Sequence, residues 1–263
     1  MAAVPLTASP QLPEGFYAIN NQFLLRGPKG FEEFKMLEEN EAMFARIDFP
    51  GVPKDNVQVT LLDSKKAVFI NATAPMDQEH DSYRIYITHA GLLCKCCAIS
   101  GFTSDMSDGV LRLVLSKTNI SPHRSSSISC LAGSGFREDL RSKGPHRYPY
   151  GTDPHDPALT GPELKPHPNV LVGPNMAYES KQLENGSLHV RLDMPGVPED
   201  RFTVSVKEGR VTVTGEALAA SHDSGGRFYS GDVAMLASPV DIPSRPIKTI
   251  IKNGVIQLFI PPV

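Results

Sequence analysis

Four cysteines are the first residues of this sequence whose types and spacing could do chemistry. Cys94, Cys96 and Cys97 fall within four positions, and clustered thiolates can bind zinc. Structural zinc sites, however, normally use two separated C-x(2–4)-C pairs, and only Cys130 or a linker histidine is left to complete such a set. In a strand over residues 92–99, Cys97 would face away from Cys94 and Cys96. We therefore expect buried small hydrophobic side chains and no metal site, with a redox-sensitive pair and a metal site as the less favoured alternatives.

A His-Asp-Ser triplet occurs twice, at 80–82 and 222–224, and Ser221 precedes the second copy. These are the residue types of a hydrolase triad, but three consecutive loop residues cannot place nucleophile, base and orienting acid in one line of hydrogen bonds. The sequence also lacks a Gly-x-Ser-x-Gly elbow. We expect turns at both triplets and solvated carboxylates at the acidic pairs 32–33 and 38–39. The chain is thus expected not to be an enzyme and to carry no cofactor.

An internal repeat defines the elements that position these residues. The segment RIDFPGVPKD at 46–55 recurs as RLDMPGVPED at 191–200, with seven of ten positions identical, and SDGVLRLVL at 107–115 matches KNGVIQLFI at 252–260. The stretch between the two copies holds eight of the 23 prolines and is typical of a linker. We predict four segments: an N-terminal extension (1–25), a first domain (26–120), a Pro/Gly/Ser-rich linker (121–172) and a second domain (173–263).

Both copies are predicted to be β-structure. Apolar and hydroxyl residues alternate over 202–206 and 211–214, with a turn between them, and Asn-Gly dipeptides mark two more hairpins. Residues 32–37 and 42–49 taken alone are compatible with a helix, but the matching part of the second copy contains Asn185-Gly186 and an alternating pattern. We therefore predict paired strands there and, overall, an all-β chain of two immunoglobulin-like sandwiches in tandem.

Composition excludes several classes of protein. The formal net charge of −3 gives no general attraction to nucleic acid, and no apolar run reaches the roughly 18 residues that span a bilayer. The N-terminus lacks a signal peptide pattern, and clustered cysteines are not a secreted disulfide framework. We expect a soluble cytoplasmic and/or nuclear protein that binds neither nucleic acid directly nor membranes.

The repeated motifs resemble the α-crystallin domain of small heat-shock proteins. That family has a D-x-P-G-V step after its third strand and a G-V-L step before its last, which match 48–52 with 109–111 and 193–197 with 254–256. The sequence from about residue 153 onward is similar to a group of plant proteins called putative heat shock proteins or Hsp20-like chaperones. This resemblance implies a sandwich of seven or eight strands.

Two departures from the family bear on assembly. The family's C-terminal Ile-x-Ile/Val tail, which builds large oligomers, has no counterpart after Pro261, and only short segments stand where many plant members insert a swapped strand. We therefore expect intramolecular pairing of the two units or a dimer through strand edges. A monomer or small oligomer is expected rather than a large shell.

The resemblance also implies a binding groove between strands four and eight of each domain. The expected client-binding side chains are apolar residues of these strands: Phe202, Val204, Val206, Ile247, Ile250 and Ile251 in the second unit, and Val57, Val59 and Leu61 in the first. The alternative is that these side chains face the core between the sheets, because period-two patterns do not distinguish the two faces.

Three functional hypotheses follow from this resemblance. The first is an ATP-independent chaperone that binds unfolded or extended client segments through sheet edges and apolar grooves. The second is a non-chaperone adaptor of a plant regulatory complex, such as a nuclear anti-silencing or DNA-demethylation assembly. The third is a cochaperone of a related sandwich fold.

Overall fold

The chain is all β, as the sequence predicts. The computed structural model describes residues 14–16, 21–28, 30–37, 42–76, 82–92, 94, 96–120, 131–132, 166–236 and 246–262. Within these ranges every regular element is a strand, apart from the two short 3-10 helices η2 (Lys54–Asn56) and η4 (Glu199–Arg201). None of the helices described is long and apolar enough to cross a membrane.

The first repeat contributes two sheets that enclose one core. The first sheet runs, in spatial order, β1 (Glu14–Phe16), β3 (Glu32–Leu37), β4 (Ala42–Asp48), β9 (Val110–Asn119), β8 (Cys97–Ser107). The second runs β10 (Leu131–Ala132), β7 (Arg84–Leu92), β6 (Ala67–Ala74), β5 (Val57–Leu61). Their facing apolar side chains form a buried cluster that includes Met43, Ile70 and Leu113.

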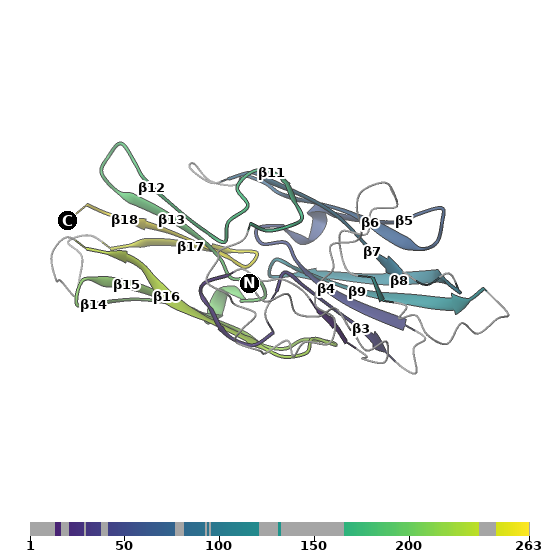
Figure 1. Ribbon diagram of the computed structural model, residues 1–263. Helices are drawn as coiled ribbons and strands as arrows, with labels where there is room; N and C mark the ends of the chain where they lie inside the picture. The colour runs from purple at the N-terminus through teal and green to yellow at the C-terminus, as the bar shows by residue number, and fades with distance from the viewer. Residues whose placement is uncertain are drawn as a thin grey trace, which may run out of the picture.

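The second repeat forms a matching sandwich with a separate core. One sheet runs β12 (Tyr178–Gln182), β13 (Leu188–Asp193), β18 (Val255–Ile260), β17 (Lys248–Lys252). The other runs β14 (Phe202–Lys207), β15 (Arg210–Ala217), β16 (Arg227–Met235), β2 (Leu24–Arg26). The core is built around Leu192, Val213 and Ile256. The two sandwiches lie side by side (Figure 1).

The two sandwiches exchange a short strand. β2 precedes the first repeat in sequence but pairs with β16 of the second, placing Leu24 opposite Tyr229. In return, β11 (Val170–Val172) precedes the second repeat and pairs with β7 of the first, placing Val170 opposite Tyr86. A Gly-Pro step follows each exchanged strand, so the two exchanges occupy equivalent places in the repeat.

The exchange involves the edges of the predicted segments. β2 spans the boundary between the predicted extension and the predicted first domain, and β11 lies inside the predicted linker. The bounds of the four segments stay predictions, and most of the linker is outside the described residues, as are residues 80–81 and 38–39.

Local sequence explains the remaining strands. Residues 32–37 and 42–48 are paired strands, which confirms that the repeat overrides their helical composition. The Pro-Gly-Val-Pro steps contain left-handed turns, with φ of 88° at Gly51 and 90° at Gly196. Each step therefore turns the chain sharply out of a central strand and into the 3-10 turn before the next sheet.

Candidate functional site

The predicted groove residues of the first repeat lie along an open edge of its sandwich. Val57, Val59 and Leu61 alternate with exposed residues on β5 and pack against the core while staying partly exposed. β8, the edge of the facing sheet, contacts β5 and presents Phe102 and Met106 to the same core. These side chains thus line the core and also reach the surface, and their role in client binding stays a prediction.

In the second repeat, β14 and β17 form the edge equivalent to that of β5 and β8. Phe202, Val204 and Val206 are partly buried against the core, whereas the residues between them are exposed. Ile251 of β17 and Ile247, which directly precedes β17, pack against the same core, at the repeat positions of Met106 and Phe102.

One predicted groove residue lies elsewhere. Ile250 pairs with Gln257, whereas its neighbour Ile251 pairs with the core residue Ile256. Successive strand residues point to opposite faces, so Ile250 lies on the outer face of β17 and lines a pocket between the repeats. The second groove is therefore formed without Ile250.

The edges of these grooves can accept an added strand. Within the described residues, β5, β8, β14 and β17 each pair with one neighbour, so each leaves one row of backbone N–H and C=O groups facing outward. An extended peptide can bond to such a row and place alternate side chains against the apolar groove.

The hallmark turns of one repeat bond to those of the other. The Gly51 N–H donates to Asn253 O at 2.9 Å, and the Gly196 N–H donates to Asp108 O at 2.8 Å. In each case the P-G-V step of one repeat meets the hairpin turn before the last strand of its partner. The motifs by which the sequence resembles its family thus form the interface between the repeats.

Glycine is required where these turns meet. A Cβ on Gly109 would lie 2.4 Å from Asn253 O, and a Cβ on Gly254 would lie 2.3 Å from Asp108 O. Both glycines also have positive φ, of 70° and 69°. The two backbones therefore approach too closely for any side chain at either position.

Two buried ion pairs cross the same interface. Arg84 Nη1 donates to Asp193 Oδ2 at 2.5 Å, and Arg227 Nη1 donates to Asp48 Oδ2 at 2.7 Å. Burial alone would lower the pKa of each arginine, but the facing aspartate charge raises it well above its usual range. Both guanidinium groups therefore stay charged, and each compensates a buried carboxylate of the other repeat.

Two buried side chains, His167 and Asn21, bond to the backbone carbonyls of the two motif aspartates. His167 Nε2 donates to Asp48 O at 2.8 Å, because its Nδ1 accepts the Asn169 N–H at 3.2 Å. At the equivalent position of the repeat, Asn21 Nδ2 donates to Asp193 O at 2.5 Å and its Oδ1 accepts the Phe23 N–H at 3.0 Å. Burial lowers the pKa of His167 to about 4, so the ring is neutral at physiological pH.

The second His-Asp-Ser triplet lies in a turn, as expected, and this turn contacts the first repeat. Asp223 accepts two hydrogen bonds from Arg112 of the first repeat, at 3.0 and 2.7 Å, and lies 3.7 Å from Arg46. Burial would raise the pKa of Asp223, but the bonds from Arg112 and the charge of Arg46 lower it overall. The Ser224 N–H donates to Glu33 Oε1 at 2.6 Å. The prediction that Glu32 and Glu33 are solvated is wrong: this turn covers Glu33, and buried Glu32 accepts a hydrogen bond from Asn169 Nδ2 at 2.7 Å.

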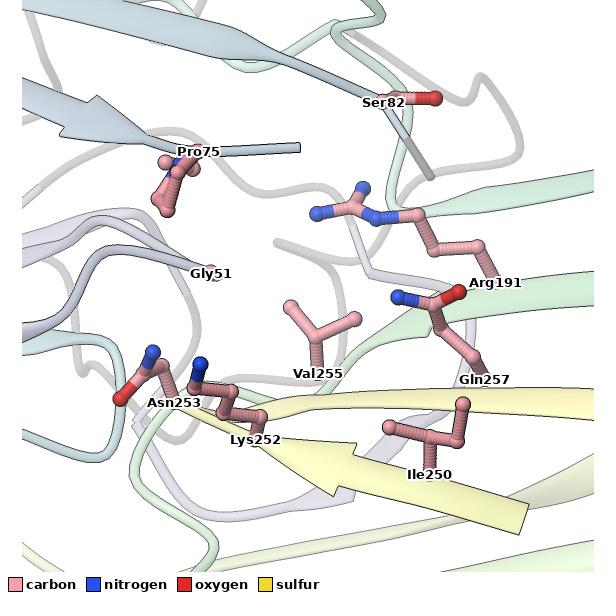
Figure 2. Close-up of a pocket in the computed structure, with 10 residues that line it drawn as sticks. Gly51, Pro75, Ser82, Arg191, Ile250, Lys252, Asn253, Val255 and Gln257 are labelled. Carbon is pink, nitrogen blue, oxygen red and sulfur yellow. The ribbon is translucent and has the colours of Figure 1, made fainter. Parts of the chain in front are cut away.

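A pocket between the repeats is lined by polar and apolar residues of both. Figure 2 shows Arg191 extending from β13 toward Gly51 and Pro75 of the first repeat. Arg191 Nη1 lies 3.0 Å from Asp193 Oδ1, so this side chain belongs to the network of the interface ion pairs. Gln257 stands here at the repeat position of Arg112. The pocket is part of the interface and is separate from the apolar grooves.

The three clustered cysteines converge, contrary to the sequence argument. β7 ends at Leu92 and β8 begins at Cys97, so the chain turns through this segment instead of running as one strand. The three sulfur atoms lie within 4.8 Å of one another, with Cys96 and Cys97 Sγ 3.6 Å apart. The cluster could not be expected from a strand that begins at residue 92, because β8 begins only at Cys97. Cys130 lies outside the described residues.

The two sandwiches and their hallmark turns define a protein of the α-crystallin type. A family model described as "Predicted plant small heat shock protein" matches residues 3–263, and the chain belongs to that family. This confirms the resemblance seen in the sequence.

Curated relatives carry heat shock names. The chain is 38% identical over 294 residues to the putative 57 kDa heat shock protein of Arabidopsis thaliana, an alignment that covers 84% of this chain and 55% of that protein. It is 28% identical over 107 residues to the mitochondrial heat shock 22 kDa protein of Pisum sativum, covering 37% of this chain and 48% of that one. The chain thus spans about half the length of these curated relatives.

Proposed function

We propose that the chain is an ATP-independent molecular chaperone that binds unfolded or extended client segments at the β5/β8 and β14/β17 grooves. The observation that carries this proposal is the pairing, at each groove, of an outward-facing strand edge with partly exposed apolar side chains. Membership of a small heat shock family supports it.

The expected binding mode follows from the geometry of β14. A client segment would bond to the outward backbone row and bury every second side chain against Phe202, Val204 and Val206. Each well-buried aliphatic client side chain contributes roughly 1.5–3 kcal/mol, and part of this gain is offset by ordering the segment. Such binding needs no nucleotide and no catalytic group. It favours any unfolded chain with alternating apolar residues over a folded protein.

The proposed assembly is a monomer or a small oligomer. The edges of β7 and β16 are covered within the chain by β11 and β2, so these edges are not open to a second subunit. The grooves, in contrast, stay accessible at the outer edges of both sandwiches.

An aggregation assay tests this proposal. The protein should suppress heat aggregation of a model enzyme at stoichiometric or lower amounts, and Val204→Asp or Val59→Asp should weaken suppression several-fold. Thr203→Asp is the matched control, because Thr203 is exposed between two groove residues on the same strand. Val204→Thr keeps the side-chain shape and checks that lost suppression is not lost folding. No suppression at several-fold molar excess would refute the proposal.

The adaptor is the second candidate, and the intramolecular strand exchange favours it. Because the exchange fixes the two grooves within one chain, they could bind two defined segments of one partner. Affinity purification from source tissue distinguishes the two functions. A few stoichiometric partners that do not change on heating indicate an adaptor, whereas a heat-dependent set of clients indicates a chaperone.

A further inference from the structure

The cysteine corner, which comprises Cys94, Cys96 and Cys97, lies where the chain passes between the two sheets of the first sandwich. β7 belongs to one sheet and β8 to the other, and the corner joins them. Its three sulfur atoms come within 4.8 Å of one another. Ligand sulfurs around a tetrahedral zinc ion lie about 3.8 Å apart, as a Zn–S bond of about 2.3 Å requires. The observed separations are thus close to those of a metal site.

Hydrogen bonds to the three cysteine carbonyl groups hold the corner in this shape. Lys66 Nζ donates to Cys94 O at 3.2 Å and also to Cys97 O. The Ile120 N–H donates to Cys96 O at 2.8 Å. Binding a metal ion would therefore require small side-chain movements and no rearrangement of the chain. The Lys66 ammonium group also offsets the negative charge that three thiolates would leave around a divalent ion.

The fold itself does not require these thiols. The second repeat forms the same sandwich, yet residues 173–263 contain no cysteine. Cys94 and Cys97 are buried and Cys96 is half-buried, so the cluster is open to solvent on the Cys96 side. A site with two buried ligands and one accessible ligand has an entry path for an ion.

A metal fits this corner better than a disulfide between the closest pair. Cys96 and Cys97 are sequence neighbours, so their Cα atoms are held about 3.8 Å apart by a trans peptide. Disulfides normally join Cα atoms roughly 4.4–6.8 Å apart. All three sulfurs can instead contact one central ion.

We propose that Cys94, Cys96 and Cys97 form a three-thiolate binding site for a thiophilic d10 metal ion such as Zn²⁺. Each coordinated thiol releases its proton to solvent, so one ion displaces up to three protons. Because coordination releases these protons, Zn²⁺ affinity should rise with pH between pH 6 and pH 8.

The test uses the reduced full-length protein and Zn²⁺ in competition with a chromophoric chelator. One ion should bind per chain. Cys96→Ser should weaken binding about 100-fold or more, while the matched Cys130→Ser variant should keep the wild-type affinity. The melting temperature of Cys96→Ser without metal verifies that it folds, since this side chain is half-buried.

A second measurement needs no variant. Bound Zn²⁺ should protect Cys94, Cys96 and Cys97 from alkylation, as mapped by peptide mass spectrometry, and leave Cys130 reactive. The proposal is overturned if wild type binds less than one ion in ten chains, if Cys96→Ser binds as tightly as wild type, or if Zn²⁺ protects Cys130 alone.

Discussion

Arg227 of the second repeat donates to Asp48 of the first at 2.7 Å, at a fully buried point of the interface. Asp48 also belongs to the D-x-P-G-V step by which the sequence resembles its family. The motif aspartate therefore has a physical role, which is to anchor the arginine that begins β16 of the other sandwich. Arg84 and Asp193 make the same contact in the reverse sense.

Removal of one member of this pair should destabilise the whole chain. Arg227→Met removes one of two charged partners of buried Asp48, which keeps Arg46 at 2.9 Å, so we expect the free energy of unfolding to fall by about 3 kcal/mol, the lower end for a broken buried pair. Arg210→Met is the matched control, since Arg210 pairs with Asp232 at 3.0 Å with side chains 57% and 46% exposed, and should cost about 0–1 kcal/mol. Denaturant titration followed by circular dichroism measures both. Equal losses in free energy of unfolding would show that the buried interface pair stabilises the chain no more than the exposed pair does.

The meeting of the hairpin turns gives a prediction about glycine. Gly254→Ala forces a Cβ to 2.3 Å from Asp108 O at a positive φ, so the turns must separate. We expect a loss of about 2 kcal/mol or more. Gly101→Ala should change stability by less than about 0.5 kcal/mol, because no atom lies within 4 Å of the added Cβ. A Gly254→Ala protein as stable as Gly101→Ala would contradict the close approach of the repeats.

Buried His167 should make stability depend on pH. Its pKa is about 4 in the folded chain and near 6.5 when unfolded, so protonation favours the unfolded state. Titration of His167 does not change stability above about pH 7, and it lowers stability as the pH drops from about 6.5 to 4. At about 1.4 kcal/mol per pH unit, lowering the pH from 7.5 to 5 costs about 2 kcal/mol.

The repeat supplies the variant that removes this dependence. Asn21 makes the equivalent hydrogen bonds on the other side, so His167→Asn should fold and should lose about 2 kcal/mol less than wild type between pH 7.5 and pH 5. Unfolding titrations at the two pH values measure this difference. The same pH dependence in both proteins would assign the acid sensitivity to other groups.

Much of the fold could be predicted because the chain contains two copies of the same domain sequence. The second copy contains Asn185-Gly186 and alternating apolar residues, and these decided that residues 32–37 and 42–48 are strands. The Pro-Gly-Val-Pro steps likewise favour left-handed turns at their glycines, and Gly51 and Gly196 have φ of 88° and 90°. Such local features depend on neighbouring residues and can be deduced without knowing the tertiary structure.

Features set by distant pairing could not be predicted. A three-residue strand such as Leu24–Arg26 has no periodicity that shows which sheet it will join, so the strand exchange was not expected. A shift of one residue decides whether Ile250 or Ile251 faces the core, and the start of β8 at Cys97 decides whether the cysteines converge. The sequence pattern is compatible with either choice in both cases.

Hydrogen exchange during client capture tests the central proposal most directly. The wild-type chain is incubated with a thermally unfolding enzyme, and amide protection is mapped by mass spectrometry. Client binding at the grooves predicts added protection on the edge strands β5, β8, β14 and β17, and loss of the β14 protection in Val204→Asp but not in Thr203→Asp. Protection restricted to other strands, such as β12, or no change in the presence of a bound client, would contradict it.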